Sequence, residues 1–421
     1  MRANRYPKRT YPLIAAATVL ALLSAMAPAG AAAATAPYIV GVDVRVDPAV
    51  AAARVGVIPA LVLTEVFHGY VADLTRTQLT RVRKDPATLS IEEETTSPVT
   101  FPKATVDPPQ PAQSVRNPVR RVGGLGSPTA RIDGIDERVN VDVAIIDSGI
   151  DADHPDLNVA GGVNCVGNRG GFADTDSHGT MVAGLVGAID NAIGVVGVAP
   201  GARVWAVRVT SGNGGQITDR RLLCGLEWVA ANAHIIDVAN MSLRGVTKLE
   251  SDTCESPNRK AAALHQAVCR LVELGVVVVV AAGNDTSDVA GVVPARFPEV
   301  ITVSAISDSD GMPGGLGGAP VCLPGENDDT FATFSNFGLE VDVAAPGSCI
   351  TSTHPDGLYA FNSGTSFATP LVSGAAALYL ATHPDGTPAE VRMAIINAAE
   401  PGPIPGDPDP YPEGILNVNG F

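Results

Sequence analysis

Residues 362–370 read Asn-Ser-Gly-Thr-Ser-Phe-Ala-Thr-Pro, so that a turn of small residues runs directly into a helical pattern of apolar residues. Pro370 falls in the first turn of the expected helix, where a missing backbone N–H removes no hydrogen bond. Ser366 is therefore expected at or beside the helix N-terminus, where free N–H groups and the helix dipole favour developing negative charge. By itself this serine is either a simple N-cap or a nucleophile suited to attack on a carbonyl group.

Towards the N-terminus from this helix, apolar strands alternate with helical segments through the body of the chain. Buried strands are expected at residues 141–146, 203–209, 235–239, 276–282, 300–303 and 341–344. Helices are expected from about residue 178, over 219–232 and 259–274, and after Ser366. This alternation predicts an α/β fold in which a mostly parallel sheet is covered by helices on both faces.

Three further polar residues stand at the ends of these elements, where sites lie in such a sheet. Asp147 follows the first buried strand, His178 opens a helix of small residues, and Asn284 follows a strand of pure core residues. Taken separately, each is a turn, capping or structural residue. Together with Ser366 they supply the parts of acyl transfer. Ser366 is the nucleophile, His178 the general base and then acid, and Asp147 orients the imidazole. The Asn284 amide and the Ser366 N–H would hold the oxyanion.

The motifs around these residues resemble those of the subtilisin-family serine proteases. They are Asp147-Ser148-Gly149-Ile150, His178-Gly179-Thr180, Asn240-Met241-Ser242-Leu243, Ala282-Gly283-Asn284 and Gly364-Thr365-Ser366 through Pro370. The order Asp, His, Ser along the chain is that of subtilisin and differs from that of α/β-hydrolases. The resemblance runs from about Ala112 to the C-terminus, and it implies a subtilisin-like peptidase domain over residues 112–421.

The resemblance also implies which residues bind the substrate. Ser242-Leu243 and Gly214-Gly215 would form two edges that pair with the substrate backbone as added strands. Ala282 and Gly283, together with Asn284, would border the pocket for the residue before the cleaved bond.

Two residues depart from the family pattern near these motifs. Met181 stands where the family usually has a second histidine, which is not a position of the triad. Arg244 replaces a small residue beside the substrate-binding edge, where it would hinder binding or favour an acidic group nearby.

A structural calcium site is implied by the same resemblance. Its ligands would be side-chain oxygens of Gln113, Asp156 and Asn191 and main-chain carbonyls of Ile189, Ile193 and Val195. Ligation by oxygen alone suits Ca²⁺. The alternative is a loop that holds no ion.

The N-terminal region is interpreted as three segments that precede the peptidase domain. Residues 1–36 have a basic start, an apolar run too short for a membrane span and A-x-A sites, which predicts a secretory signal peptide; a retained anchor is the alternative. Residues 38–96 show strand and helix patterns that resemble the inhibitory propeptide of the family. The stretch 97–130 is rich in proline and is expected to be a linker. We therefore assign residues 37–111 to propeptide and linker, with a processing site between Thr96 and Ala112.

Composition and cysteine content agree with an exported protein. Residues 1–111 carry 11 basic and 9 acidic side chains, whereas the remaining 17 basic and 35 acidic side chains give the rest a net charge of −18. An acidic body argues against a nucleic-acid partner. The six cysteines are expected to form disulfides. Fifteen pairings are possible; the shortest loops join Cys254 to Cys269 and Cys322 to Cys349, leaving Cys165 with Cys224.

We interpret the chain as a secreted, extracellular serine endopeptidase that is made as a zymogen. Its partners would be protein or peptide substrates and its own propeptide, with no nucleic acid, no membrane after signal removal and a monomeric state. A catalytically silent subtilisin-like binding protein is the alternative from another class, and it would need a broken triad or a lost oxyanion donor. A secreted esterase is a further alternative, against which the peptide-binding edges speak.

Overall fold

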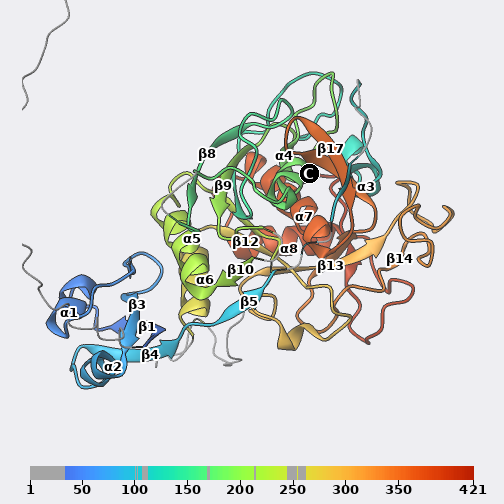
Figure 1. Cartoon of the computed structure of the whole chain (residues 1–421). Coiled ribbons are helices and arrows are strands. Elements are labelled where there is room, and N and C mark those ends of the chain that lie inside the picture. Colours follow the sequence, from blue (N-terminus) through green and yellow to red (C-terminus); the bar gives the residue numbers. More distant parts are fainter. Residues whose placement is uncertain are drawn as a thin grey trace, which may run out of the picture. The chain divides into compact units, whose positions relative to one another are not determined.

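The computed structural model describes residues 34–99, 101, 103–106, 112–167, 171–212, 215–243, 254 and 262–421 (Figure 1). Nearly all of the predicted signal peptide lies outside the described residues, as do Gly214 and Arg244. Among the described residues, no helix combines the length and the apolar character needed to cross a membrane.

Residues 35–94 form a region, called the small domain below, that is built around a four-stranded sheet. Its elements are β1 (Thr35–Val42), α1 (Pro48–Arg54), β2 (Leu61–Leu63), β3 (Gly69–Thr75), α2 (Arg76–Val82) and β4 (Thr88–Glu93). The strand order is β2-β3-β1-β4, and the paired strands are antiparallel. Thr75 caps α2 through a capping box with Gln78. Helix α1 was not predicted, and β1 begins at Thr35, within the proposed signal peptide, whose last residue is Ala36.

The body, residues 112–421, is organised around a large sheet. The described part of this sheet has the order β18-β15-β13-β12-β11-β7-β9-β8, with β14 paired to β13. Its strands are β7 (Asp142–Asp147), β8 (Val159–Asn164), β9 (Arg203–Arg208), β11 (Val238–Met241), β12 (Val277–Ala281), β13 (Ile301–Ser307), β14 (Thr330–Phe331), β15 (Val343–Pro346) and β18 (Gly414–Ile415). Every pair is parallel except β13–β14, which confirms the predicted mostly parallel sheet.

Helices cover both faces of this sheet. They are α4 (His178–Gly187), α5 (Asp219–Ala231), α6 (Ala263–Glu273), α7 (Thr365–Thr382) and α8 (Pro388–Ala398). Side chains alternate along β7: Val143 and Ile145 join the core with α4 and α7, while Ala144 and Ile146 join the core with α5 and α6. Both faces are therefore buried, which explains the continuous apolar strands of the sequence.

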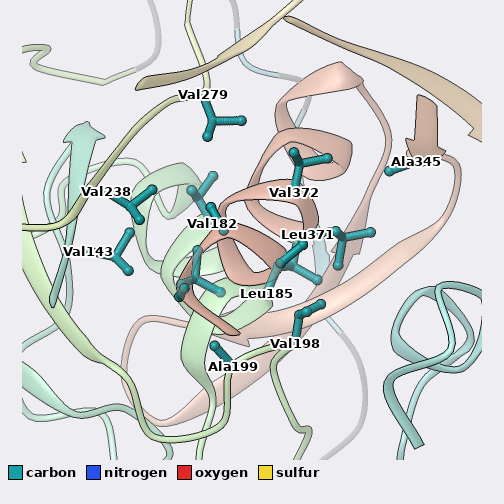
Figure 2. Close-up of a cluster of buried hydrophobic side chains, with 14 of the residues drawn as sticks. Val143, Val182, Leu185, Val198, Ala199, Val238, Val279, Ala345, Leu371 and Val372 are labelled. Carbon is teal, nitrogen blue, oxygen red and sulfur yellow. The ribbon is translucent and has the colours of Figure 1, made fainter. Parts of the chain in front are cut away.

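Helices α4 and α7 pack against each other in the middle of the larger core. Figure 2 shows Val182 and Leu185 of α4 close to Leu371 and Val372 of α7, with valines of the sheet strands beside them. Small residues line α4, and a Cβ at Gly184 would lie 2.2 Å from Thr353 Oγ1. This close packing fixes the start of both helices, and each start carries a residue of the predicted triad.

Several segments differ from the sequence-based expectation. The strand expected at 235–239 is β11, which begins three residues later at Val238. The stretch expected to be a linker contains β5 (Thr96–Pro98), β6 (Thr105–Val106) and α3 (Asn117–Arg121), and both strands pair with strands of the body. Strand β8, helix α8 and the hairpin of β16 (Ile350–His354) and β17 (Leu358–Asn362) were not predicted.

Three disulfides join the six cysteines, and they follow the shortest-loop pairing. The bonds are Cys165–Cys224, Cys254–Cys269 and Cys322–Cys349. The first joins the end of β8 to α5, and the last joins the loop before β14 to the residue before β16. The prediction of disulfides is therefore confirmed.

Candidate active site

Asp147 and His178 meet at the carboxyl end of the central strand β7. Asp147 is the last residue of β7 and is fully buried, and His178 is the first residue of α4. Nδ1 of His178 lies 2.9 Å from both carboxylate oxygens of Asp147. This contact fixes the orientation of the imidazole ring and directs Nε2 away from the carboxylate.

Glycines allow these two segments to approach closely. A Cβ at Gly179 would lie 2.1 Å from the carbonyl oxygen of Gly149, so only glycine fits directly after His178. The Gly179 N–H donates to Ser148 Oγ at 2.9 Å, which ties the start of α4 to the residue after Asp147. The Asp-Ser-Gly and His-Gly-Thr motifs are thus two halves of one contact.

Asp174 is a supporting residue that the sequence reasoning missed. Its carboxylate accepts hydrogen bonds from Ser148 Oγ, Thr180 Oγ1 and the N–H groups of Asp176, Ser177 and Thr180. It therefore supplies the acceptor for the first turn of α4, where Ser177 adopts φ 92° and provides no side-chain cap. An acidic residue four positions before His178 could have indicated this role, because carboxylates accept N–H groups at helix starts.

Ser366 is the second residue of α7 and not its cap, because Gly364 holds the N-cap position. Its Oγ donates to the Ser242 carbonyl at 3.2 Å, and Ser242 Oγ donates to the Ser366 carbonyl at 2.8 Å. These two hydrogen bonds join the end of β11 to the start of α7. Nε2 of His178 is buried and has no hydrogen-bond partner among the described residues. Ser366 Oγ and His178 Nε2 are therefore not hydrogen-bonded to each other in this conformation.

Asn284 follows β12 and is anchored to the same helix start. Its Oδ1 accepts from the Thr365 N–H at 2.8 Å and from Thr365 Oγ1 at 3.0 Å. Since the oxygen is engaged, Nδ2 remains as the donor group of this exposed side chain. Gly283 precedes it at φ 108°, where a Cβ would lie 2.4 Å from Asn336 Nδ2, so glycine is required there.

A cavity of about 350 Å³ brings together five of the ten residues predicted for catalysis and substrate binding. Its lining includes Ser242, Leu243, Gly283, Asn284 and Ser366. Ala282 is fully buried and is absent from the lining, where Ala281 appears instead. The residues on either side of Ala282, Ala281 and Gly283, line the cavity, but Ala282 itself does not.

The chain itself runs through this cavity. Strand β5 pairs antiparallel with β10 (Gln216–Thr218), and the Val99 N–H donates to the Gly215 carbonyl at 3.0 Å. Phe101 then stacks on the His178 ring with ring centroids 3.7 Å apart. Further on, β6 pairs antiparallel with β17, which leads towards Ser366. Strands β5 and β6 are therefore both extended, and both pair with segments of the body that border the candidate site.

Carboxylates at the boundary between the small domain and the body hold the two together. Glu227 of α5 accepts the N–H groups of Thr64, Glu65 and Val66 at 2.6, 2.9 and 3.1 Å. In the other direction, Glu94 and Glu92 accept N–H groups at the starts of α5 and α6, from Arg220 and Ala263, both at 3.2 Å. Acidic side chains at helix N-termini are favourable because they complement unpaired N–H groups.

The side chains predicted to bind calcium also converge. Asn191 Nδ2 donates to Asp156 Oδ1 at 3.0 Å, and Gln113 Oε1 accepts the Asn191 N–H at 2.5 Å. Asp156 Oδ2 accepts from the Val195 N–H at 3.1 Å and from Tyr359 OH at 3.2 Å. Burial raises the pKa of Asp156 to about 6, and the hydrogen bonds from its neutral donors lower this pKa only in part.

These residues fit a cation. A fully buried carboxylate without a charged partner is costly, and a bound cation would compensate it. Asn191 Oδ1 accepts the Ile193 N–H at 2.7 Å, so a cation at Asp156 would have to replace this hydrogen bond and the one from Asn191 Nδ2. A separate group of carboxylates, Asp308, Asp310 and Asp328, also offers oxygens within 4.8 Å of one another and could hold a metal ion.

Comparison with known proteins identifies the family of this chain. Residues 139–416 match the Subtilase family, peptidase family S8, over more than half of the chain. The chain therefore belongs to the subtilase family, whose class is the subtilisin-type serine proteases, and its fold is the subtilisin-like α/β fold.

Individual relatives are similar over the same region. Subtilisin NAT of Bacillus subtilis subsp. natto is 41% identical over 286 residues, which cover 66% of this chain and 65% of that protein. Subtilisin of Bacillus pumilus is 40% identical, and the match covers 90% of it. The crystal structure of a cold adapted subtilisin-like serine proteinase has a TM-score of 0.52 at 29% identity, covering 70% of this chain and 98% of that one. The match thus spans about two thirds of this chain.

Proposed function

We propose that this protein is a secreted serine endopeptidase with the triad Asp147, His178 and Ser366 and the oxyanion donor Asn284. The observation that carries the proposal is the contact of His178 Nδ1 with both oxygens of Asp147, beside a cavity lined by Ser366 and Asn284. Four side chains from separate elements supply the roles that acyl transfer requires. Fluorophosphonate labelling and casein digestion test the proposal, and Ser366→Ala is the decisive variant.

In the proposed mechanism, Ser366 Oγ turns from the Ser242 carbonyl to His178 Nε2 and attacks the substrate carbonyl. His178 accepts the hydroxyl proton and later donates it to the leaving amine, while Asp147 stabilises the imidazolium. The carbonyl oxygen acquires negative charge and is held by Asn284 Nδ2 and the Ser366 N–H at the start of α7. Collapse of the tetrahedral intermediate breaks the peptide bond, and water then releases the acyl group by the same steps.

We further propose that the small domain is the inhibitory propeptide. Support comes from β5, which pairs with β10 as a substrate would, and from Phe101, which covers the His178 ring. A substrate could not reach Ser366 while these residues are in place. The catalytically silent alternative is disfavoured because neither the triad nor Asn284 is altered.

The path of the chain predicts where the precursor is cut. Because Phe101 stacks on the His178 ring and Lys103 lines a cavity with Asn284 and Gly364, we propose that the cut falls between Phe101 and Thr105. We expect N-terminal sequencing of the mature protein to begin at Lys103 or Ala104.

The Ser366→Ala precursor is the control for this cut and should keep the small domain attached. A mature chain that begins at Ala112 or later, or before Ser97, would contradict the predicted position.

A calcium ion at Gln113, Asp156 and Asn191, with carbonyls of Ile189, Ile193 and Val195, is a further proposal for stability. Bound Ca²⁺ would neutralise the buried carboxylate and fix residues 189–195. We expect a chelator to lower the Tm by about 5 °C, the scale for a ligand that favours only the folded state. Differential scanning calorimetry with and without Ca²⁺ measures this.

Asp156→Asn is the matched control for the calcium site, since it keeps the shape and removes the charge. Its Tm should no longer respond to Ca²⁺. Equal responses of the wild type and Asp156→Asn would exclude this site and direct attention to the carboxylates of Asp308, Asp310 and Asp328.

A further inference from the structure

A second cavity adjoins the first, and the two share Asn284 and Ser363 in their linings. It has a volume of about 360 Å³, and it is lined by Lys103 and Thr105 of the chain itself and by Leu323, Phe334 and Phe361. Asn284, Ser363 and Gly364 complete the side nearest to the nucleophile. The wall is therefore mostly apolar and adjoins the candidate catalytic centre.

The order of the paired segments along the chain indicates which part of a substrate this cavity would contact. Residues 96–99 pair with β10 before the chain passes His178, and Thr105–Val106 pair with β17 after it. Lys103 and Thr105 thus stand where residues C-terminal to a cleaved bond would lie. In an extended chain, alternate residues point to the same side, so both of them can face one wall.

The loop that supplies Leu323 is residues 308–329, between β13 and β14, and it is held in place at several points. Asp328 accepts the N–H groups of Ser309 and Gly317, both at 2.7 Å. Buried Glu326 accepts from Ser307 Oγ at 3.0 Å and from Thr333 Oγ1 at 2.5 Å. The acidic side chains of this loop therefore organise its backbone internally.

The Cys322–Cys349 disulfide fixes the tip of the loop beside the nucleophile. The Cys349 N–H donates to Ser363 Oγ at 2.9 Å, and the Cys322 N–H contacts Cys349 Sγ at 3.1 Å. Ser363 lies three residues before Ser366. These contacts connect the segment that carries Leu323 to the residues just before α7.

We propose that the 308–329 loop is a specificity wall that selects substrates by an apolar side chain among the first three residues after the cleaved bond. This inference rests on the proposed function. Leu323 and Phe334 bury apolar surface of that side chain, as they can the aliphatic stem of Lys103. The short side chain of aspartate would instead lose its hydration without gaining a partner. Leu323 acts as a specificity residue and takes no part in the chemistry.

The test uses processed protein obtained from the full-length chain. The substrates are internally quenched peptides with one scissile bond. Each of the three positions after that bond is varied in turn, and it carries Leu, Gly or Asp. The wild type should prefer Leu to Asp at one or more of these positions. Leu323→Ala should reduce kcat/KM for the Leu peptide about fivefold, because a smaller apolar contact is formed. The Gly peptide should change less than twofold.

Two controls separate a specificity role from a general defect. Leu316→Ala alters the same loop at a residue that is 90% exposed and outside the cavity lining, and it should leave the preference unchanged. Peptide nitroanilides, which have no residue after the scissile bond, should be cleaved by Leu323→Ala as by the wild type. The proposal is overturned if Leu323→Ala slows all substrates equally or keeps the wild-type preference. A wild type that cleaves no peptide and resists fluorophosphonate would instead reject the proposed function.

Discussion

Ser366→Ala is expected to abolish both casein digestion and fluorophosphonate labelling. The variant loses the only atom proposed to form the acyl-enzyme, while the hydrogen bond from Ser242 Oγ to the carbonyl of residue 366 remains available to hold the helix start. In subtilisin, a relative of this chain, loss of the nucleophile lowers kcat by about 10⁶-fold, and we adopt that scale. The variant should also accumulate as the uncut precursor, which mass spectrometry detects directly.

Ser373→Ala is the matched control, because it removes a hydroxyl group from the same helix. Ser373 Oγ donates to Asn240 Oδ1 at 2.9 Å and lies outside the cavity. This variant should retain labelling and digestion. A Ser366→Ala protein that still digests casein after removal of contaminating proteases would refute the assignment of the nucleophile.

Asn284→Asp should lower kcat by about two to three orders of magnitude with a small change in KM, which is the scale known for the oxyanion donor of subtilisin. The aspartate keeps an oxygen for the Thr365 N–H and Oγ1, so the anchor of the helix start is preserved. It replaces the amide donor with a second acceptor that repels the developing oxyanion. The variant should therefore lose transition-state stabilisation but keep the substrate binding that comes from pairing with the substrate backbone.

Steady-state kinetics on a peptide nitroanilide distinguishes this role from a structural one. If Asn284 only positions Thr365, Asn284→Asp should be nearly as active as the wild type. A fall in kcat with unchanged fluorophosphonate labelling at long times would indicate that the nucleophile is intact and the oxyanion donor is missing. Unimpaired kcat would exclude Asn284 from the oxyanion hole.

The sequence predicted the parts of the site whose position follows from the topology of a parallel sheet. Asp147 and Asn284 each follow a buried apolar strand, and the carboxyl ends of such strands lie at one edge. His178 opens a helix whose small residues indicated close packing. Asp174 was missed because it acts by accepting hydrogen bonds from five donors in one turn. The spacing of apolar residues, on which the prediction relied, does not reveal such a turn.

Other errors have separate physical origins. The prolines of residues 97–130 indicated a linker, yet β5 and β6 form by pairing with strands more than 100 residues away, for which the segment itself carries no signal. Helix α8 was missed although Thr387 and Glu390 form a capping box that is readable in the sequence. Ser366 was expected as a possible cap, but Gly364, with φ 151°, holds that position.

Dilution should activate the protein after the cut, because the small domain is held to the body only by noncovalent contacts such as those of Glu227, Glu94 and Glu92. While the connecting peptide bond is intact, the small domain faces its binding surface at an effective concentration of about millimolar. Once the bond is cut, the same surface must be found by diffusion, and occupancy then depends on total protein. On the proposed function, a freshly cut preparation would gain specific activity when diluted, and a variant weakened at Glu227 would gain it at higher concentration.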